Sequence, residues 1–359
     1  MLLSDLVGAA PRLALVGLAK NTGKTVTLNA IIGELADAGT VLGVTSVGRD
    51  GEEHDVIDFR IEKPRVLLGA GSLVATTDSL LRASGTPHET LSRTGIRTPL
   101  GEVLVARLRG AGRIEIAGPS AAADVRTTSD AMLDAGAAQV LIDGAIDRRA
   151  ASSPDVADGL IMATGAILSN DLEEVVARTR DAVALVRLPL VPSDTPEGLA
   201  LRALAEREAG LSLLIADDMR ADPLPPRFVL TAQDGHLQRL MADNGDARTL
   251  IVAGALPEAF VAGLARATRR EARRLTLIVG DPTHVFLSER PVEHYSRAGI
   301  DLQTLRAIDL LALTVNPVAP QSHSFDSAHL RASLAEEIRE LPIFDVMHPE
   351  YRGSQPRRA

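Results

Sequence analysis

The most constraining feature of the chain is the segment Gly17-Leu-Ala-Lys-Asn-Thr-Gly-Lys-Thr25. An apolar run, Leu13 to Val16, precedes it, and residues 28 to 35 follow with apolar side chains on one helical face. A strand that leads through a glycine-rich turn into a helix points backbone N–H groups and the positive end of the helix dipole at one place. The segment therefore predicts an anion-binding loop.

The residue types in this loop are those that hold a nucleoside triphosphate. Lys24 is expected along the β- and γ-phosphates, and the Thr25 hydroxyl is expected to ligate Mg²⁺. The predicted nucleotide contacts in the loop are Gly17, Asn21, Thr22, Gly23, Lys24, Thr25 and Val26. The alternative is a strand-to-helix turn that binds nothing, and Gly-Lys-Thr after an apolar strand argues against it.

Acidic residues supply candidate metal ligands. Asp143 follows the apolar run Val140 to Ile142, so a strand delivers a carboxylate at its carboxyl end, which predicts an Mg²⁺ ligand beside Thr25. Asp50 and Glu52 lie in a polar loop that follows a second predicted strand. Either one is suited to hold Mg²⁺ through water or to polarise an attacking water, and a plain acidic surface loop is the equal alternative. Lys24, Asp50 and Asp143 form the predicted catalytic set, with Thr25, Asp143 and Glu52 at the metal.

Asn316 is the last candidate contact. It ends a late apolar run, Ala307 to Val315, and precedes two prolines. Its amide can donate to and accept from an adenine edge. An Asx turn before proline is the equal alternative.

Composition limits the protein class. The 359 residues include no cysteine, which excludes disulfides and thiolate chemistry, and only 2% aromatics, which predicts an aliphatic core. A net charge of −9 argues against a nucleic-acid or anionic-membrane surface. No apolar run is long enough to span a bilayer, so a cytoplasmic protein is expected.

Alternating strand and helix patterns predict an α/β fold with a doubly wound, mostly parallel sheet. Together with this sheet, the glycine loop resembles that of a P-loop NTPase. The predicted core is 1–190, and its last strand is expected at 182–187. A β-rich insertion is expected at 56–112, with a hairpin within 63–78. Residues 191–285, with a strand at 228–231, are expected to form either a second α/β unit or further strands of the same sheet. Residues 286–350 return to the core, and 351–359 form a tail. Arginines between 266 and 274 are expected to interact with a helix dipole, with anion or partner binding as the alternative.

Three motifs resemble the dethiobiotin synthetase and cobyrinate amidoligase class. They are the loop at 17–25 with its five-residue spacer, Asp143-Gly-Ala145, and Val315-Asn316-Pro317. The resemblance implies that Asn316 contacts adenine. It also implies an alternative activity, ATP-dependent ligation through a phosphorylated carboxylate, in which Lys20 and Lys63 would bind the acyl phosphate.

A wider set of stretches resembles the P-loop subunit of the reactivating factor for lysine 5,6-aminomutase. The stretches are 45–52, 63–64, 74–77, 94–102, 114–120 and 141–148. This resemblance implies an Mg²⁺-dependent ATPase whose partners are a second reactivase subunit and a cobalamin- and pyridoxal-phosphate-dependent aminomutase. ATP would drive exchange of damaged cobalamin for intact cofactor. A nucleotide-binding module without turnover and a homo-oligomer also remain open from the sequence.

Overall fold

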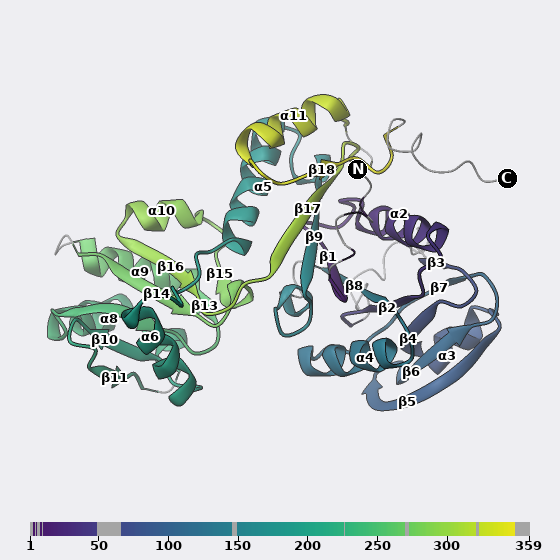
Figure 1. The fold of residues 1–359 in the computed structure, drawn as a ribbon. Coiled ribbons are helices and arrows are strands. Elements are labelled where there is room, and N and C mark those ends of the chain that lie inside the picture. Colours follow the sequence, from purple (N-terminus) through teal and green to yellow (C-terminus); the bar gives the residue numbers. More distant parts are fainter. Residues whose placement is uncertain are drawn as a thin grey trace. The chain divides into compact units, whose positions relative to one another are not determined.

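The structure, a computed structural model, describes residues 3, 5, 8, 10–48, 66–145, 149–225, 227–269, 273–320 and 323–348. The chain forms two compact units (Figure 1). Unit 1 comprises Met1–Arg180 and Ile308–Ala359, and unit 2 comprises Asp181–Ala307. Unit 2 is therefore an insertion between two parts of unit 1.

Unit 1 is built on a nine-stranded sheet in the order β18-β17-β9-β1-β8-β2-β4-β6-β5. Its strands are β1 (Arg12–Gly17), β2 (Leu42–Ser46), β4 (Leu73–Thr77), β5 (His88–Thr98), β6 (Gly101–Leu108), β8 (Gln139–Ala145), β9 (Gly159–Gly165), β17 (Asp309–Asn316) and β18 (Ile343–Phe344). Neighbours from β18 to β4 pair in parallel, while β6 pairs antiparallel with β4 and β5. The predicted mostly parallel sheet in an α/β fold is confirmed.

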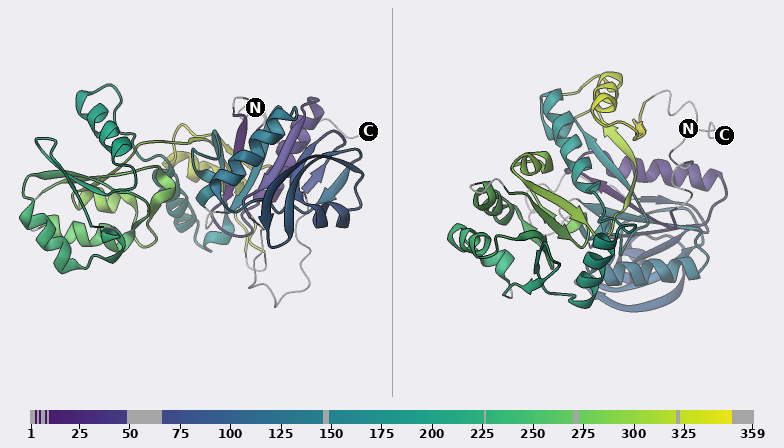
Figure 2. Two further views of the ribbon diagram at one scale, coloured as in Figure 1. Left: turned by 90° about the horizontal axis from the view of Figure 1, so that it is seen from below. Right: turned by 60° about the vertical axis from the view of Figure 1, so that its left-hand side comes forward.

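The longer helices among the described residues of unit 1 are α2 (Lys24–Asp37), α3 (Asp78–Ala83), α4 (Ala122–Asp134) and α11 (Ser327–Glu337), and α5 (Leu172–Val186) begins in unit 1 and continues into unit 2. Short 3₁₀ turns lie at Arg149–Ser152 and Ala166–Leu168. Figures 1 and 2 show α2 and α4 on opposite faces of the sheet. α2 lies in the crossover between the parallel strands β1 and β2, and α4 precedes β8.

The core of unit 1 is aliphatic, as the composition predicts. Every residue of β9 is buried, and only Arg12 of β1 is partly exposed, so both strands are covered on both faces. Leu28, Ile31 and Leu35 of α2 pack into this core. The spacing read from the sequence therefore marks the buried face of α2.

The insertion after β2 differs from its prediction. The hairpin predicted within 63–78 is wrong, because β3 (Val66–Leu68) pairs with β7 (Gly112–Ile114) in a separate two-stranded sheet. β4 instead joins the main sheet between β2 and β6. All five residues of β4 are buried, and such a strand needs a neighbour on each side.

Unit 2 has a five-stranded sheet in the order β11-β10-β12-β14-β16. Its strands are β10 (Leu213–Ala216), β11 (Ala221–Pro223), β12 (Ala247–Ile251), β14 (Leu275–Val279) and β16 (Ile300–Thr304), with a separate pair β13 (Leu256–Pro257) and β15 (Val285–Phe286). Its helices are α6 (Pro196–Arg207), α7 (Phe228–Thr231), α8 (Asp234–Asp243), α9 (Glu258–Arg269) and α10 (Val292–Arg297), and Pro282–His284 form a 3₁₀ turn, η3. β12, β14 and β16 run parallel.

Unit 2 extends further than the predicted 191–285. Residues up to 307 belong to it because β16 pairs in parallel with β14. The strand predicted at 182–187 is wrong, since α5 continues to Val186 and buries Val175, Thr179 and Val183 at four-residue spacing. The strand predicted at 228–231 is also wrong, because that short apolar run forms α7.

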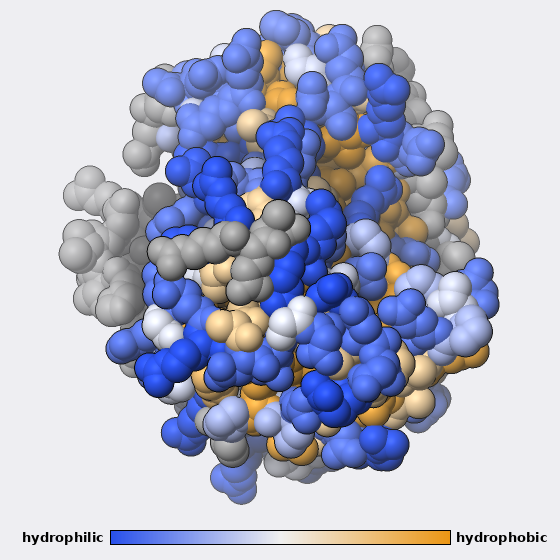
Figure 3. All heavy atoms as spheres, turned by 90° about the vertical axis from the view of Figure 1, so that its left-hand side faces the viewer, coloured by the Kyte–Doolittle hydropathy of each residue, from blue (hydrophilic) through white to orange (hydrophobic). Residues whose placement is uncertain are grey.

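Surface character agrees with the charged composition. The face in Figure 3 is mostly hydrophilic, with hydrophobic residues showing between the polar ones. Within the described part of the chain, no helix combines the length and apolar character needed to cross a bilayer.

Candidate functional site

The glycine loop, residues 17–23, leaves the carboxyl end of β1 in the middle of the unit 1 sheet. β1 lies between β8 and β9, and the Leu18 N–H donates to the Ala163 carbonyl of β9 at 2.9 Å. In open parallel sheets, ligands bind at the carboxyl ends of the strands. The loop therefore begins where such a sheet places its ligand.

Two residues of the glycine loop have left-handed backbone conformations, Asn21 with φ 65° and Gly23 with φ 87°. Glycine adopts this region without a Cβ penalty. Gly17 is required for a different reason, because a Cβ there would lie 2.5 Å from the Thr22 hydroxyl oxygen. That hydroxyl donates to the Ala19 carbonyl at 3.0 Å, so the Thr22 side chain stabilises the turn itself.

The start of α2 carries backbone donors that lack acceptors. Among the residues that the structure describes, the N–H groups of Gly23, Thr25 and Val26 have no hydrogen-bond partner. Helix starts leave such donors unless a side chain caps them, and the N-cap here is a glycine with no acidic residue in the turn that follows. With the positive end of the helix dipole added, this helix start is suited to an anion.

Lys24 and Asp143 meet beside these donors. Lys24 Nζ lies 3.0 Å from Asp143 Oδ1 and donates to the Gly144 carbonyl at 2.7 Å. β8 brings the carboxylate there because it pairs in parallel with β1, with Asp143 opposite Leu15. Both side chains are only 13% exposed. An ammonium and a carboxylate thus share one largely buried place.

The donor set fits a nucleotide-bound Mg²⁺ better than a metal held by protein alone. Within the described residues, no three His, Asp or Glu side chains gather into a metal-binding group. Mg²⁺ in nucleotide sites usually takes one or two protein ligands and completes its shell with phosphate oxygens and water. Thr25 is half-buried in the first turn of α2. Val26, 40% exposed and apolar, offers an anion only its backbone N–H.

Asn316 reaches the glycine loop from the far end of the chain. At the end of β17, its Nδ2 donates to the Asn21 carbonyl at 2.9 Å. Its Oδ1 accepts from the Val318 N–H at 3.1 Å. This bond is the Asx turn that the sequence offers as the alternative to an adenine contact. The structure therefore places Asn316 at the loop, with both ends of its amide bonded to backbone.

Three predicted site residues, Asp50, Glu52 and Lys63, lie outside the described residues. The loop, Lys24, Thr25, Asp143 and Asn316 are described and lie at the carboxyl ends of β1, β8 and β17. One contact was missed from the sequence. The Thr27 hydroxyl donates to the Thr314 hydroxyl at 2.9 Å, with both residues buried. A single threonine in a strand gives no signal of such a partner.

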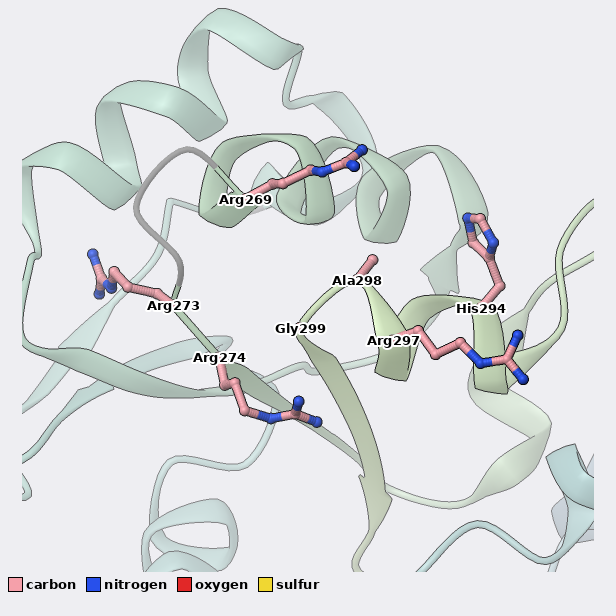
Figure 4. A pocket seen from close by; sticks show the side chains of 7 residues that line it. All are labelled: Arg269, Arg273, Arg274, His294, Arg297, Ala298 and Gly299. Atoms are coloured by element: carbon pink, nitrogen blue, oxygen red, sulfur yellow. The ribbon is translucent and has the colours of Figure 1, made fainter.

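A basic pocket lies in unit 2 (Figure 4). Its volume is about 470 Å³, and its lining comprises Arg269, Arg273, Arg274, His294, Arg297, Ala298 and Gly299. The arginine side chains spread in different directions rather than toward one point.

The arginines of this pocket serve the unit 2 fold. Arg273 donates to three carbonyls around the end of α8, those of Met241, Asn244 and Ala247. Arg274 forms a bidentate ion pair with Asp301, in which Nε donates to Oδ2 at 3.0 Å and Nη2 donates to Oδ1 at 2.7 Å. Arg269 and Arg297 lie in the last turns of α9 and α10. Cations stabilise helix carboxyl ends, so the geometry favours the helix-dipole interpretation.

Comparisons of the chain with protein-family models, curated proteins and solved structures found no match. The chemistry of the site therefore follows from its own geometry.

Proposed function

We propose that this chain binds ATP with Mg²⁺ at the glycine loop and hydrolyses it, its doubly wound sheet being that of a P-loop NTPase. The observation that carries the proposal is the set of N–H donors without acceptors at the start of α2, beside Lys24 and Asp143. Lys24 would hold the β- and γ-phosphates, and Thr25 and Asp143 would hold the metal. Mg²⁺ would supply neutralisation of the charge on the transferring phosphate.

The ion pair between Lys24 and Asp143 supports joint binding of nucleotide and metal. Both groups are partly buried, and burying an unpaired charge is costly. Phosphate oxygens are a new partner for the ammonium, and a divalent cation is a new partner for the carboxylate. When Mg²⁺-ATP binds, Lys24 would exchange the carboxylate for phosphate and Asp143 would exchange the ammonium for Mg²⁺, so both charges would stay paired.

The proposed biological role is that of an accessory subunit that reactivates an aminomutase. Its support is the similarity of stretches such as 45–52, 114–120 and 141–148 to the P-loop subunit of the lysine 5,6-aminomutase reactivating factor. ATP hydrolysis would be coupled, with a second reactivase subunit, to cofactor exchange on a cobalamin- and pyridoxal-phosphate-dependent enzyme.

The test compares ATP binding and phosphate release by the wild type, Lys24→Ala and Lys20→Ala. We expect Lys24→Ala to weaken ATP binding about 100-fold, since charge-assisted contacts to phosphate are lost, and Lys20→Ala to bind normally. Normal ATP binding by Lys24→Ala would refute the site.

A second arm adds aminomutase and the second reactivase subunit. Phosphate release should rise in their presence, and unchanged release would refute the accessory role. Transfer of labelled oxygen from a carboxylic acid into phosphate would instead establish a ligase.

A further inference from the structure

We infer that Asn316 is a positioning residue that holds the glycine loop in its phosphate-binding shape, rather than a reader of the nucleotide base. The inference rests on the proposed function, because it assigns a role within that site. It begins from the two hydrogen bonds of the Asn316 amide.

Each end of the Asn316 amide bonds one backbone group. Nδ2 donates to the Asn21 carbonyl at 2.9 Å and Oδ1 accepts from the Val318 N–H at 3.1 Å. Only this amide orientation satisfies both partners, because one offers an acceptor and the other a donor. The Asn21 carbonyl belongs to a residue with φ 65°, so the contact fixes a left-handed turn that a non-glycine residue rarely adopts.

The packing around Asn316 leaves little room for another position. A Cβ on Gly23 would lie 3.2 Å from the Asn316 Cβ, and a Cβ on Gly165 would lie 2.2 Å from the Asn316 carbonyl oxygen. Gly23 of the loop and Gly165 of β9 therefore leave the space that Asn316 occupies. Close backbone approach of this kind suits a group that braces the loop.

β17 holds the same region through a second side chain. Thr314, two residues before Asn316, bonds the Thr27 hydroxyl in the first turns of α2 at 2.9 Å. Both threonines are at most 2% exposed. β17 thus forms hydrogen bonds with the loop at Asn21 and with the helix at Thr27. The N–H donors without acceptors lie between these two residues in the sequence.

The two roles of Asn316 predict different ligand dependence. An amide that reads adenine, through its second N–H and the second lone pair of Oδ1, contributes only to ligands that carry the base. A bracing amide acts on the loop, and therefore affects every ligand that the loop holds by its phosphates. Inorganic tripolyphosphate, which carries no base, separates the two.

The first experiment measures binding of Mg²⁺-ATP and Mg²⁺-tripolyphosphate to the wild type, Asn316→Ala and Asn29→Ala. Asn29 is the matched control, because its Oδ1 accepts from the Leu67 N–H elsewhere on α2. We expect Asn316→Ala to weaken both ligands by a similar factor, about 10-fold, as for the loss of a positioning contact. A loss confined to ATP, or no loss, would overturn the inference.

The second experiment needs no ligand and therefore tests the inference even if the wild type binds no phosphate. Hydrogen exchange of residues 17–23 in the free protein should quicken in Asn316→Ala and stay unchanged in Asn29→Ala. Should Asn316→Ala not fold, Asn316→Asp replaces it, since a carboxylate keeps the Val318 contact and cannot donate to the Asn21 carbonyl. Unchanged exchange in the folded variant would overturn the inference.

Discussion

The two units each contain a cluster of backbone N–H groups, and they treat it differently. In unit 2, the N–H groups of Ser288, Glu289 and Arg290 converge on the Glu258 carboxylate at 2.7–2.8 Å. The Tyr295 hydroxyl adds a fourth donor at 2.8 Å. In unit 1, the donors at the start of α2 have no such carboxylate among the described residues.

The difference teaches where an added anion belongs. Converging N–H groups form an anion site whatever supplies the negative charge. Unit 2 fills its cluster with its own side chain, so that cluster stabilises the fold. Unit 1 leaves its cluster open and places Lys24 beside it, as a site for a mobile phosphate requires.

The largest expected effect comes from removing the Glu258 carboxylate from the N–H cluster of unit 2. Glu258→Ala should destabilise unit 2 by about 2–4 kcal/mol, because three backbone donors and a tyrosine hydroxyl lose a charged acceptor. Denaturant unfolding measures it. Glu293→Ala is the control, since its ion pair with Arg297 is exposed and should contribute little. Equal stability of the Glu258→Ala variant and the wild type would break the comparison.

Acid should reproduce part of this loss. Burial raises the pKa of Glu258, but the N–H and hydroxyl donors outweigh it and lower the pKa from 4.5 to about 2. A carboxylate with a depressed folded pKa stabilises fully above its unfolded value, and the contribution is lost as pH falls from 4.5 toward 2. Unfolding measured across this range should therefore lose more stability per pH unit in the wild type than in Glu258→Gln. The same slope in both proteins would contradict the assignment.

The next effect concerns the ion pair in unit 1. Asp143→Asn removes the carboxylate that pairs with Lys24, so ATP without metal should bind about 10-fold more tightly, while Mg²⁺ should no longer improve binding. Calorimetric titration with and without Mg²⁺ measures both. Tighter binding that still depends on Mg²⁺ would remove Asp143 from the metal site.

The smallest effect comes from giving the N–H cluster of unit 1 a carboxylate of its own, as unit 2 has. Val26→Glu places a carboxylate in the first turn of α2 at a residue that is 40% exposed. It should stabilise the protein by about 0.5 kcal/mol through the helix dipole and lower ATP affinity several-fold by repelling phosphate. Val26→Gln is the neutral control. If Val26→Glu bound ATP as well as Val26→Gln, phosphate would not approach this helix start.

The sequence predicts the parts of the site that depend on local pattern. β1, the loop and α2 are contiguous, and Asp143 follows an apolar strand, so short-range spacing is enough to identify them. The position of Asn316 depends instead on β17 lying next to β9 in the sheet, 295 residues beyond Asn21. The Asx turn to Val318 follows from the neighbouring prolines, but the bond to Asn21 cannot be read from the residues around Asn316.

The errors in the fold have the same origin. The strand–helix alternation predicts a strand at 182–187, but α5 continues to Val186 because Val183 extends its buried face. β4 was assigned to a local hairpin and joins the main sheet instead. Tertiary packing decides such short apolar segments, and one sequence does not reveal it.

The most direct test of the open N–H cluster is hydrogen exchange of the segment 17–27 before and after addition of Mg²⁺-ATP. The account predicts that exchange slows at Gly23, Thr25 and Val26 in the wild type, and that Lys24→Ala shows no slowing at the same nucleotide concentration. Exchange that stays unchanged in the wild type at saturating Mg²⁺-ATP would contradict it.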